Sequence, residues 1–170
     1  YFQFNEILEF CEQVGLSIYK KELYEADDII ASLVKQSNEL CTIVTNDKDL
    51  DQILQTGRVG RYYKRQGNPW DFYGQKQAEI DWEIPQSLFE AKKTLVGCST
   101  DCIPGCKGIG PITATSLLNE FGSIENILLN KDKLSKSLQT KLTNFDLELN
   151  RKLIKLVDDL TLVSSRRDFQ

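Results

Sequence analysis

The sequence predicts an α/β region followed by an all-helical region. Before residue 84, short β-branched runs alternate with segments whose apolar residues recur at helical spacing, which is typical of parallel strands joined by helices. After Pro85 only helical spacing remains. A chain of 170 residues with 41% apolar side chains is long enough for one domain, or one and a half, with a buried core.

The first part of the α/β region predicts two helices and a strand. Apolar side chains recur at helical spacing over 4–14, and Gly15 ends this segment. We expect a short strand over 16–19. A second helix opens at Glu25 and buries an apolar face that extends to Val34.

The second part of the α/β region centres on a buried parallel strand. This strand is predicted over 41–45, a β-branched run between polar segments. A helix begins at Leu50 and ends at Gly57, and another strand follows over 58–64. The polar and aromatic residues 65–82, interrupted by glycine and proline, predict a loop or a short hairpin.

The region after Pro85 predicts five helices. Gly122 has the residue type that ends a helix, and Ser123 has the type that begins the next one. The helices are expected over 88–96, 111–121, 124–129, 134–142 and 145–158.

A glycine-rich hairpin over 97–111 joins the first two of these helices. Without Cβ atoms at Gly105, Gly108 and Gly110, backbone N–H groups can approach an anion closely. Pro111 suits the first position of the next helix. A tight link with purely structural glycines is the alternative interpretation.

Charge and cysteine usage narrow the class of protein. Residues 1–60 carry eleven acidic and five basic side chains, and residues 103–143 carry three and five. This asymmetry suits a metal site beside a phosphate-contacting surface, although ordinary surface charge explains it equally well. Five irregularly spaced cysteines and no histidine disfavour a structural zinc site and fit a reducing compartment, cytoplasm or organelle. We expect no membrane partner, because no long apolar run and no signal peptide is visible.

Acidic residues gather at the ends of predicted elements. Carboxylate oxygens bind Mg²⁺, and two such ions about 3.5–4 Å apart can activate water and stabilise the leaving oxygen of a phosphodiester. Taken singly, each acid has a structural alternative as a helix cap or a partner of the helix dipole. The candidates are Glu25, Asp27, Asp28, Asp47, Asp49 and Asp101.

Three motifs are similar to those of one known family. Residues 24–31 resemble G-x-E-A-D-D-x-x-A, residues 45–54 resemble T-x-D-K-D-L-x-Q-L-L, and residues 97–114 resemble G-D-x-x-D-N-I-P-G-v-x-G-I-G-x-x-T-A. These are motifs of the 5′ nuclease family, which includes the 5′–3′ exonuclease domain of bacterial DNA polymerase I and the flap endonucleases. The resemblance extends over about 4–163, nearly the whole chain.

The resemblance implies a PIN-like parallel-sheet nuclease core over 4–84, incomplete at its N-terminus, followed by a helix-hairpin-helix region over 85–170. Residues 1–3 resemble the tail of a cleavable tag linker. The family's first strand, two early aspartate ligands and arch over the substrate are expected upstream of this chain. A missing N-terminal segment or another polypeptide would supply them, and an attached polymerase is a further expected partner.

The resemblance also implies an activity. The expected enzyme is a 5′–3′ exonuclease or 5′-flap endonuclease that cleaves duplex DNA with a 5′ end or a 5′ flap, in repair or replication. Two Mg²⁺ or Mn²⁺ ions would act at two sites. Metal ligation is implied for Glu25, Asp27, Asp28, Asp47, Asp49 and Asp101, and a catalytic role for Asp27, Asp28, Asp47 and Asp49, whereas Asp51 is not expected to be a ligand.

The hairpin is implied to bind the DNA backbone, with K⁺ as an expected helper. The residues implied are Gly105, Lys107, Gly108, Gly110 and Thr113. Cys98 departs from the family, because it stands where a metal-ligand aspartate is expected and thiolate is a poor partner for Mg²⁺. One metal site is therefore expected to be weakened. The alternative function is a non-catalytic or fragmentary DNA-binding module with an incomplete metal site.

A basic segment follows the buried strand. It contains Arg58, Arg61, Lys64 and Arg65 beside two tyrosines. We interpret it as a solvated edge strand, because lysine and arginine are common on sheet edges. Contact with a single-stranded part of a DNA substrate is the alternative.

Overall fold

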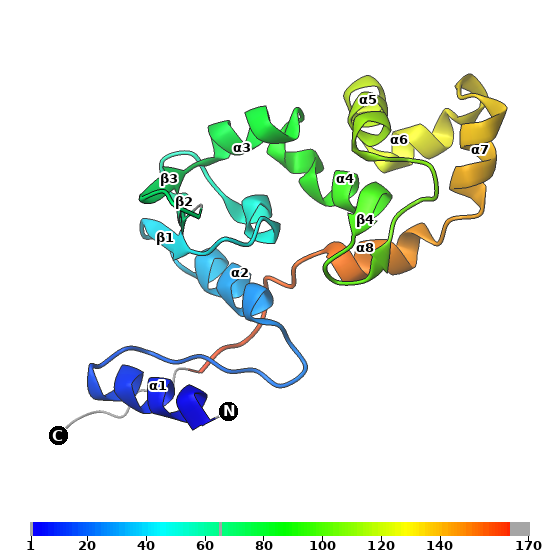
Figure 1. Ribbon diagram of the computed structural model, residues 1–170. Coiled ribbons are helices and arrows are strands. Elements are labelled where there is room, and N and C mark those ends of the chain that lie inside the picture. Colours follow the sequence, from blue (N-terminus) through cyan, green and yellow to red (C-terminus); the bar gives the residue numbers. More distant parts are fainter. Residues whose placement is uncertain (1, 65, 164–170) are drawn as a thin grey trace. The chain divides into compact units, whose positions relative to one another are not determined.

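The structure, a computed structural model, describes residues 2–64 and 66–163 and divides the chain into two compact units (Figure 1). The first unit contains the chain up to Glu39 together with the chain from Leu156 onward. The second unit, Leu40–Lys155, contains the sheet and the remaining helices. In the described ranges, no helix is both long and apolar enough to cross a membrane.

The first unit contains the helices α1 (Phe2–Gln13) and α2 (Ala26–Gln36), which confirm the two helices predicted there. The strand expected over 16–19 is wrong, because only Tyr19 forms an isolated bridge and no ladder of backbone hydrogen bonds extends from it in the part described. A strand needs such a ladder to satisfy its backbone groups.

The chain after residue 155 lies along α2. The Ser32 hydroxyl donates to the Val157 carbonyl at 3.2 Å and accepts from the Leu160 N–H at 3.1 Å. Gln36 donates to the Leu160 carbonyl at 2.7 Å. The helix predicted over 145–158 therefore ends early, because α2 side chains take up the backbone groups that a longer helix would use.

The sheet of the second unit has the order β1 (Cys41–Val44), β2 (Val59–Lys64) and β3 (Trp70–Tyr73). The strands β1 and β2 are parallel, and β2 and β3 form an antiparallel hairpin. The parallel strand predicted over 41–45 is therefore confirmed. The short 3₁₀ helix η1 (Asp49–Ile53) follows β1 and buries Leu50 completely, so its position is fixed by the core.

The basic strand β2 is the middle strand, so its interpretation as an edge strand is wrong. Arg61 is only 3% exposed and forms an ion pair with Asp51 at 2.6 Å. The Trp82 indole N–H donates to the other Asp51 oxygen at 3.1 Å. A buried charge is stable only when it is paired and hydrogen-bonded, which explains why this arginine faces inward. Arg65 lies outside the described residues.

The helix α3 (Gln75–Trp82) occupies part of the segment predicted to be a loop or hairpin. The hairpin prediction is right for β2 and β3 but wrong for these eight residues. Ala78 is the buried residue of α3, and the remaining side chains are mostly polar. Without an apolar stripe, the helical spacing of this segment is invisible in the sequence.

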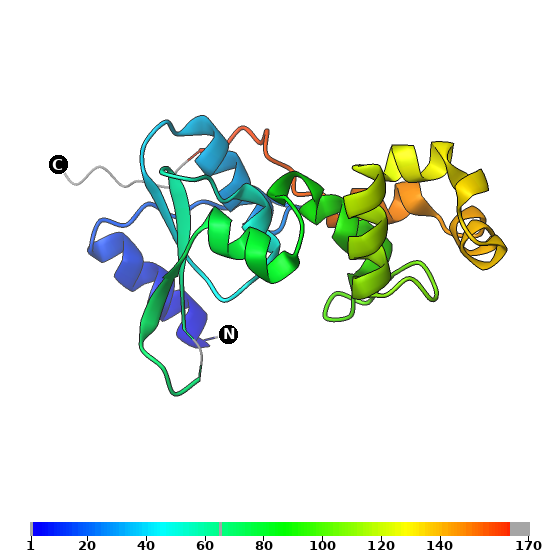
Figure 2. The ribbon, with the colours of Figure 1, turned by 90° about the horizontal axis from the view of Figure 1, so that it is seen from above.

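The helical region begins with a single 3₁₀ turn, η2 (Gln86–Leu88), and its first helix, α4 (Phe89–Val96), packs against both α5 (Pro111–Phe121) and α8 (Leu147–Ile154) (Figures 1 and 2). Pro111 begins α5 and Gly122 ends it, as predicted, and the Ser123 hydroxyl accepts from the Asn126 N–H at 3.1 Å as the cap of α6. The remaining elements are α5 (Pro111–Phe121), α6 (Ile124–Leu129), η3 (Lys131–Lys133), α7 (Lys136–Thr143) and α8 (Leu147–Ile154).

Two very short strands, β4 (Gly97–Cys98) and β5 (Ile103–Pro104), pair directly after α4. A Cβ atom on Gly105 would lie 2.0 Å from the Val96 carbonyl oxygen, and one on Gly97 would lie 2.3 Å from the Gly105 nitrogen. Only glycine permits this approach of two backbones. Asn150 of α8 donates to the Thr94 and Pro104 carbonyls at 3.3 and 2.5 Å and so fastens the same junction.

Gly105→Ala should lower the free energy of unfolding by roughly 1–3 kcal/mol, because backbone atoms that cannot move aside crowd the new methyl group. The matched control is Gly110→Ala, whose Cβ would meet no atom within 4 Å. This control changes only a helix-cap preference and should cost under about 1 kcal/mol. Chemical denaturation followed by circular dichroism measures both values, and equal losses in the two variants would contradict the close approach.

Candidate active site

A cavity of about 850 Å³ in the second unit is lined by the acidic candidate residues of that unit. The loop after β1 contributes Asp47 and Asp49, and the chain after α4 contributes Cys98 and Asp101. Two parts of the sequence separated by about fifty residues therefore meet at one opening. This arrangement is the one expected for a centre at the carboxyl end of a parallel strand.

The loop after β1 is shaped by its own side chains. The Thr45 hydroxyl accepts from the Asp47 N–H at 3.0 Å, and one Asp47 carboxylate oxygen accepts from the Asp49 N–H at 2.9 Å. The N-cap residue of η1 is Lys48, which has no side-chain cap hydrogen bond, so Asp47 orients the loop directly before η1 and does not cap it. The Asp47 side chain also lines the cavity.

Three ligand atoms converge at the cavity. A carboxylate oxygen of Asp49, the sulfur of Cys98 and a carboxylate oxygen of Asp101 all lie within 4.8 Å of one another. Asp49 and Cys98 are half-buried, and Asp101 is exposed. Two oxygen donors and one sulfur donor at this spacing suit a divalent cation, so the residues present fit such an ion chemically.

Lys93 is the functional residue that the sequence interpretation missed. Its ammonium forms a hydrogen-bonded ion pair with the Asp49 carboxylate, and its side chain is only 10% exposed. The spacing of Lys93 in the sequence could have identified it. Lys93 lies four residues after the fully buried Phe89 and so shares the inner face of α4. A lysine on such a face needs a partner, and Asp49 is that partner.

The cavity is also lined by Tyr73, Asp81, Trp82 and Lys92. The Tyr73 hydroxyl donates to Asp81 at 2.8 Å. Burial, this bond and the nearby Asp51 charge raise the pKa of Tyr73 well above its usual value. Lys92 donates to the Trp82 carbonyl at 2.6 Å, and burial lowers the pKa of this lysine despite the opposing Glu83 charge.

The glycine hairpin is anchored by two buried side chains, Cys106 and Ile109, which are 2% and 3% exposed. The Cys106 N–H donates to the Leu95 carbonyl at 2.8 Å. Burial raises the pKa of the Cys106 thiol, so this cysteine is an inert packing residue. Between these anchors, Lys107 and Gly108 are exposed to solvent.

The remaining hairpin candidates lie at the start of α5. Gly110 is exposed and is the N-cap residue, and Thr113 is half-buried in the first turn. Lys141 of α7 donates to the Gly108 carbonyl at 3.2 Å, which places a second positive charge at the hairpin. Lys107, Gly108 and Gly110 are thus exposed on the hairpin, and the binding role of the five candidates stays a prediction. Gly105 differs from the others, because it is half-buried beneath Val96.

The acidic candidates of the first unit lie at the start of α2. Glu25 is its N-cap residue, and its N–H donates to the Asp28 carboxylate at 3.3 Å. The other Asp28 oxygen accepts from the Val157 N–H at 2.8 Å. Asp28 therefore ties the start of α2 to the segment after residue 155. Asp27 is half-buried in the same turn.

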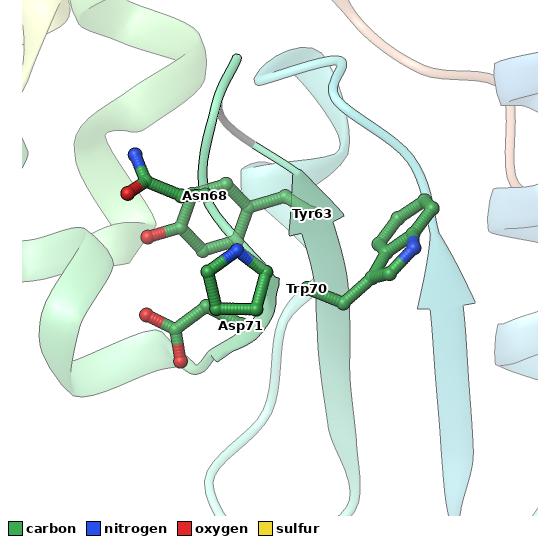
Figure 3. A pocket seen from close by; sticks show the side chains of 5 residues that line it. Tyr63, Asn68, Trp70 and Asp71 are labelled. Atoms are coloured by element: carbon green, nitrogen blue, oxygen red, sulfur yellow. The ribbon is translucent and has the colours of Figure 1, made fainter.

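A second hollow of about 480 Å³ lies at the β2–β3 hairpin (Figure 3). Tyr63 and Asp71 are register partners and share one face of the hairpin, together with Asn68. Trp70 points away from them (Figure 3). Tyr62, Trp70 and Phe72 of this hairpin are exposed, and no cluster of metal-ligating side chains is found here among the described residues.

Two family descriptions match the chain. Residues 1–82 match the 5′-3′ exonuclease N-terminal resolvase-like domain, and residues 84–170 match the 5′-3′ exonuclease C-terminal SAM fold. Together these two matches include almost every residue of the chain. The boundary between them falls close to the change in sequence pattern at residue 84.

Similar curated proteins are longer than this chain. DNA polymerase I of Treponema pallidum is 32% identical over 99% of the chain, which spans 17% of that protein. The 5′-3′ exonuclease of Aquifex aeolicus is 30% identical over 99% of the chain, which spans 57% of that protein. The chain therefore corresponds to a part of these relatives.

Solved structures share the fold. The zinc-bound 5′-exonuclease of bacteriophage T5 is 22% identical, with a TM-score of 0.77 over 91% of this chain and 59% of the phage protein. The catalytic core of Rad2 in complex with DNA substrate is 21% identical, with a TM-score of 0.58 over 97% of this chain and 60% of that solved chain. The predicted PIN-like α/β core followed by a helical region is thereby confirmed.

Tyr73→Phe should change how stability responds to alkaline pH. Because folding raises the pKa of Tyr73, the folded state binds more protons than the unfolded state above about pH 10, so the free energy of unfolding falls there as pH rises. One group contributes at most about 1.4 kcal/mol per pH unit. Denaturant titrations between about pH 9 and pH 11 should give Tyr73→Phe the shallower decline.

The matched control for this experiment is Tyr62→Phe, which removes an exposed hydroxyl from the same hairpin. It should retain the wild-type slope. Identical slopes for wild type and Tyr73→Phe would show that the Tyr73–Asp81 bond does not hold the proton.

Proposed function

We propose that this chain, which belongs to the 5′-3′ exonuclease family, forms the main part of a metal-dependent nuclease that hydrolyses DNA phosphodiesters at a 5′ end or a 5′ flap. The observation that carries the proposal is the convergence of Asp49, Cys98 and Asp101 within 4.8 Å at one cavity. The glycine hairpin follows the same residues directly in the chain, so one segment provides both metal ligands and a phosphate-binding surface.

The chemistry requires a divalent cation, Mg²⁺ or Mn²⁺, held by this cluster. Such an ion supplies charge stabilisation to the phosphate and lowers the pKa of a bound water. The zinc-bound phage relative supports the use of divalent ions in this fold. Asp47 orients the loop that carries Asp49. Lys93 offsets part of the negative charge of the cluster through its ion pair with Asp49.

A second metal group is proposed at the start of α2, formed by Glu25, Asp27 and Asp28. Its support is the family motif together with the geometry of the helix start, where residues 25 and 28 share one face. The hydrogen bonds that fix Asp28 would hold its carboxylate in a single orientation. Further ligands would come from the longer protein that the relatives represent.

The hairpin is proposed to bind the backbone of duplex DNA. Exposed Lys107 offers a charge, and Gly108 and Gly110 leave backbone groups accessible because they lack Cβ atoms. Contacts of this type position a nuclease on a duplex without reading its sequence. The Lys141 ammonium already donates to the Gly108 carbonyl. A K⁺ ion bound at the hairpin would therefore add a further positive charge beside this ammonium.

The second candidate function is a DNA-binding module without catalysis. Cys98 and Lys93 favour it, because one replaces an expected carboxylate and the other pairs with the carboxylate of Asp49. Both changes weaken the attraction of the cluster for a hard cation. DNA binding through the hairpin would survive the loss of that centre.

Asp49→Asn should reduce cleavage of a labelled 5′-flap duplex at least about 100-fold in Mg²⁺ or Mn²⁺, because a central charged ligand is lost. The matched control is Asp71→Asn, an exposed carboxylate on β3 outside the cluster, which should cleave at the wild-type rate. Undiminished cleavage by Asp49→Asn would contradict this placement of the centre. A wild-type chain that binds the flap duplex without cleaving it would support the second candidate function.

Lys107→Ala should weaken binding to duplex DNA and make it less sensitive to salt. Loss of one phosphate contact lowers the slope of log affinity against log salt concentration by about 1. Fluorescence anisotropy at several salt concentrations measures this slope. Lys76→Ala, which removes an exposed lysine from α3, is the matched control and should keep the wild-type slope. A uniform loss in both variants would show that the charge effect is not specific to the hairpin.

A further inference from the structure

We infer that the cluster of Asp49, Cys98 and Asp101 is a thiophilic metal site, which binds Zn²⁺ and other sulfur-preferring divalent cations in preference to Mg²⁺. The inference rests on the proposed function, because it concerns the metal preference of the same centre. It goes beyond that function by assigning the selectivity to one residue of this chain, Cys98.

Donor chemistry is the first argument. Mg²⁺ requires oxygen ligands in near-ideal octahedral geometry and keeps much of its water. Zn²⁺ accepts thiolate and carboxylate in the same site, and thiolate selects softer metals. A cluster with the Cys98 sulfur within 4.8 Å of two carboxylate oxygens therefore offers a softer cation a bond that Mg²⁺ does not use.

Geometry is the second argument. In a tetrahedral zinc site the Zn–S and Zn–O bonds of about 2.3 and 2.0–2.2 Å place ligand atoms roughly 3.5 Å apart. The three donor atoms lie within 4.8 Å of one another, so they close on an ion with a movement of about one ångström. Asp101 is exposed on the turn between β4 and β5, which leaves its side chain free to make that movement.

The burial and surroundings of Cys98 differ from those of a cysteine that has only a packing role. Cys106, only eight residues later, is 2% exposed and fills the core of the hairpin junction. Cys98 is half-buried, lines the cavity and lies beside two carboxylates. Its sulfur is 3.0 Å from the Thr100 hydroxyl, a bond that orients the sulfur within the turn. A packing role would place the sulfur among apolar atoms.

Lys93 adds an electrostatic argument. Its ammonium is bound to Asp49, so the cluster attracts a cation less through charge alone than three acidic ligands would. Mg²⁺ depends on this charge attraction for its affinity. The Lys93 ammonium therefore lowers the affinity for Mg²⁺ more than the affinity for an ion that also forms a metal–sulfur bond. When that bond forms, the Cys98 thiol releases its proton to solvent, so binding exchanges one S–H bond for one metal–sulfur bond.

A site of this kind differs from the structural zinc sites that the sequence argues against. Those sites use four cysteine or histidine ligands and are closed. Three protein ligands leave a fourth position for water, which is the arrangement of catalytic zinc sites. The cavity in front of the cluster provides room for that water and for a phosphate oxygen.

Cobalt(II) titration of the full chain tests the inference, because a thiolate ligand gives bound Co²⁺ a charge-transfer absorption band. Competition experiments, in which Zn²⁺ or Mg²⁺ displaces the bound Co²⁺, then give the relative affinities of these two ions. The wild-type chain should show one thiolate–cobalt band. Cys98→Asp should lose the band, and its preference for Zn²⁺ over Mg²⁺ should fall at least tenfold. Cys98→Ser tests the same loss with a side chain of nearly unchanged size.

The matched control is Cys102→Asn, which removes an exposed thiol from the same turn. Cys102 has a left-handed backbone with φ of 56°, a conformation that asparagine adopts readily, so this variant should fold and keep the band. The inference would be overturned if the band persisted in both Cys98 variants. It would also be overturned if Mg²⁺ and Zn²⁺ displaced Co²⁺ from the wild-type chain equally well.

The flap-cleavage assay separates this inference from the proposed function. A cobalt–thiolate band in a chain that cleaves no DNA with any divalent ion would leave the thiophilic site standing and remove the nuclease proposal. Cleavage in Mg²⁺ by a chain that shows no cobalt–thiolate band would support the nuclease proposal and contradict the thiophilic site.

Discussion

The close approach of two glycines positions both halves of the candidate site. Gly105 lies against the Val96 carbonyl at the end of α4, and Gly97 turns the chain with φ of 79° to allow this contact. Cys98 and Asp101 follow Gly97 within one turn, and the hairpin follows Gly105. A bulkier residue at either glycine would shift the candidate metal ligands and the hairpin together, so this backbone contact couples the two parts of the candidate site.

A buried ion pair holds η1, which carries Asp49 of the candidate site. Asp51 lies inside η1 and pairs with Arg61 of β2, while Trp82 of α3 donates to the same carboxylate. Burial raises the pKa of Asp51, and the Arg61 guanidinium opposes that rise. Removing one partner of such a pair costs about 3–5 kcal/mol, because the other charge stays buried. The pair fixes η1 to the sheet, and Asp49 is the first residue of η1.

The sequence predicted the elements whose signals are local and missed those that depend on partners distant in the chain. Helix stripes and caps located α5 and α6, and β-branched spacing located β1. Arg61 was misinterpreted because a charged residue signals an edge strand unless its partner is known, and Asp51 becomes that partner only through the fold. Lys93 was missed for the same reason, since its pairing with Asp49 joins residues 44 positions apart. The acidic clusters themselves were visible because the family motifs fix their spacing.

The composition of the candidate metal cluster decides how a substitution at Cys98 is interpreted. A metal-bound cysteine is a thiolate, so Cys98→Asp leaves the formal charge of the loaded centre unchanged. With Lys93 paired to Asp49, two carboxylates and one thiolate are neutralised by a single divalent ion and one ammonium. A change in metal preference on this substitution would therefore reflect the softness of the donor atom and not the charge of the site.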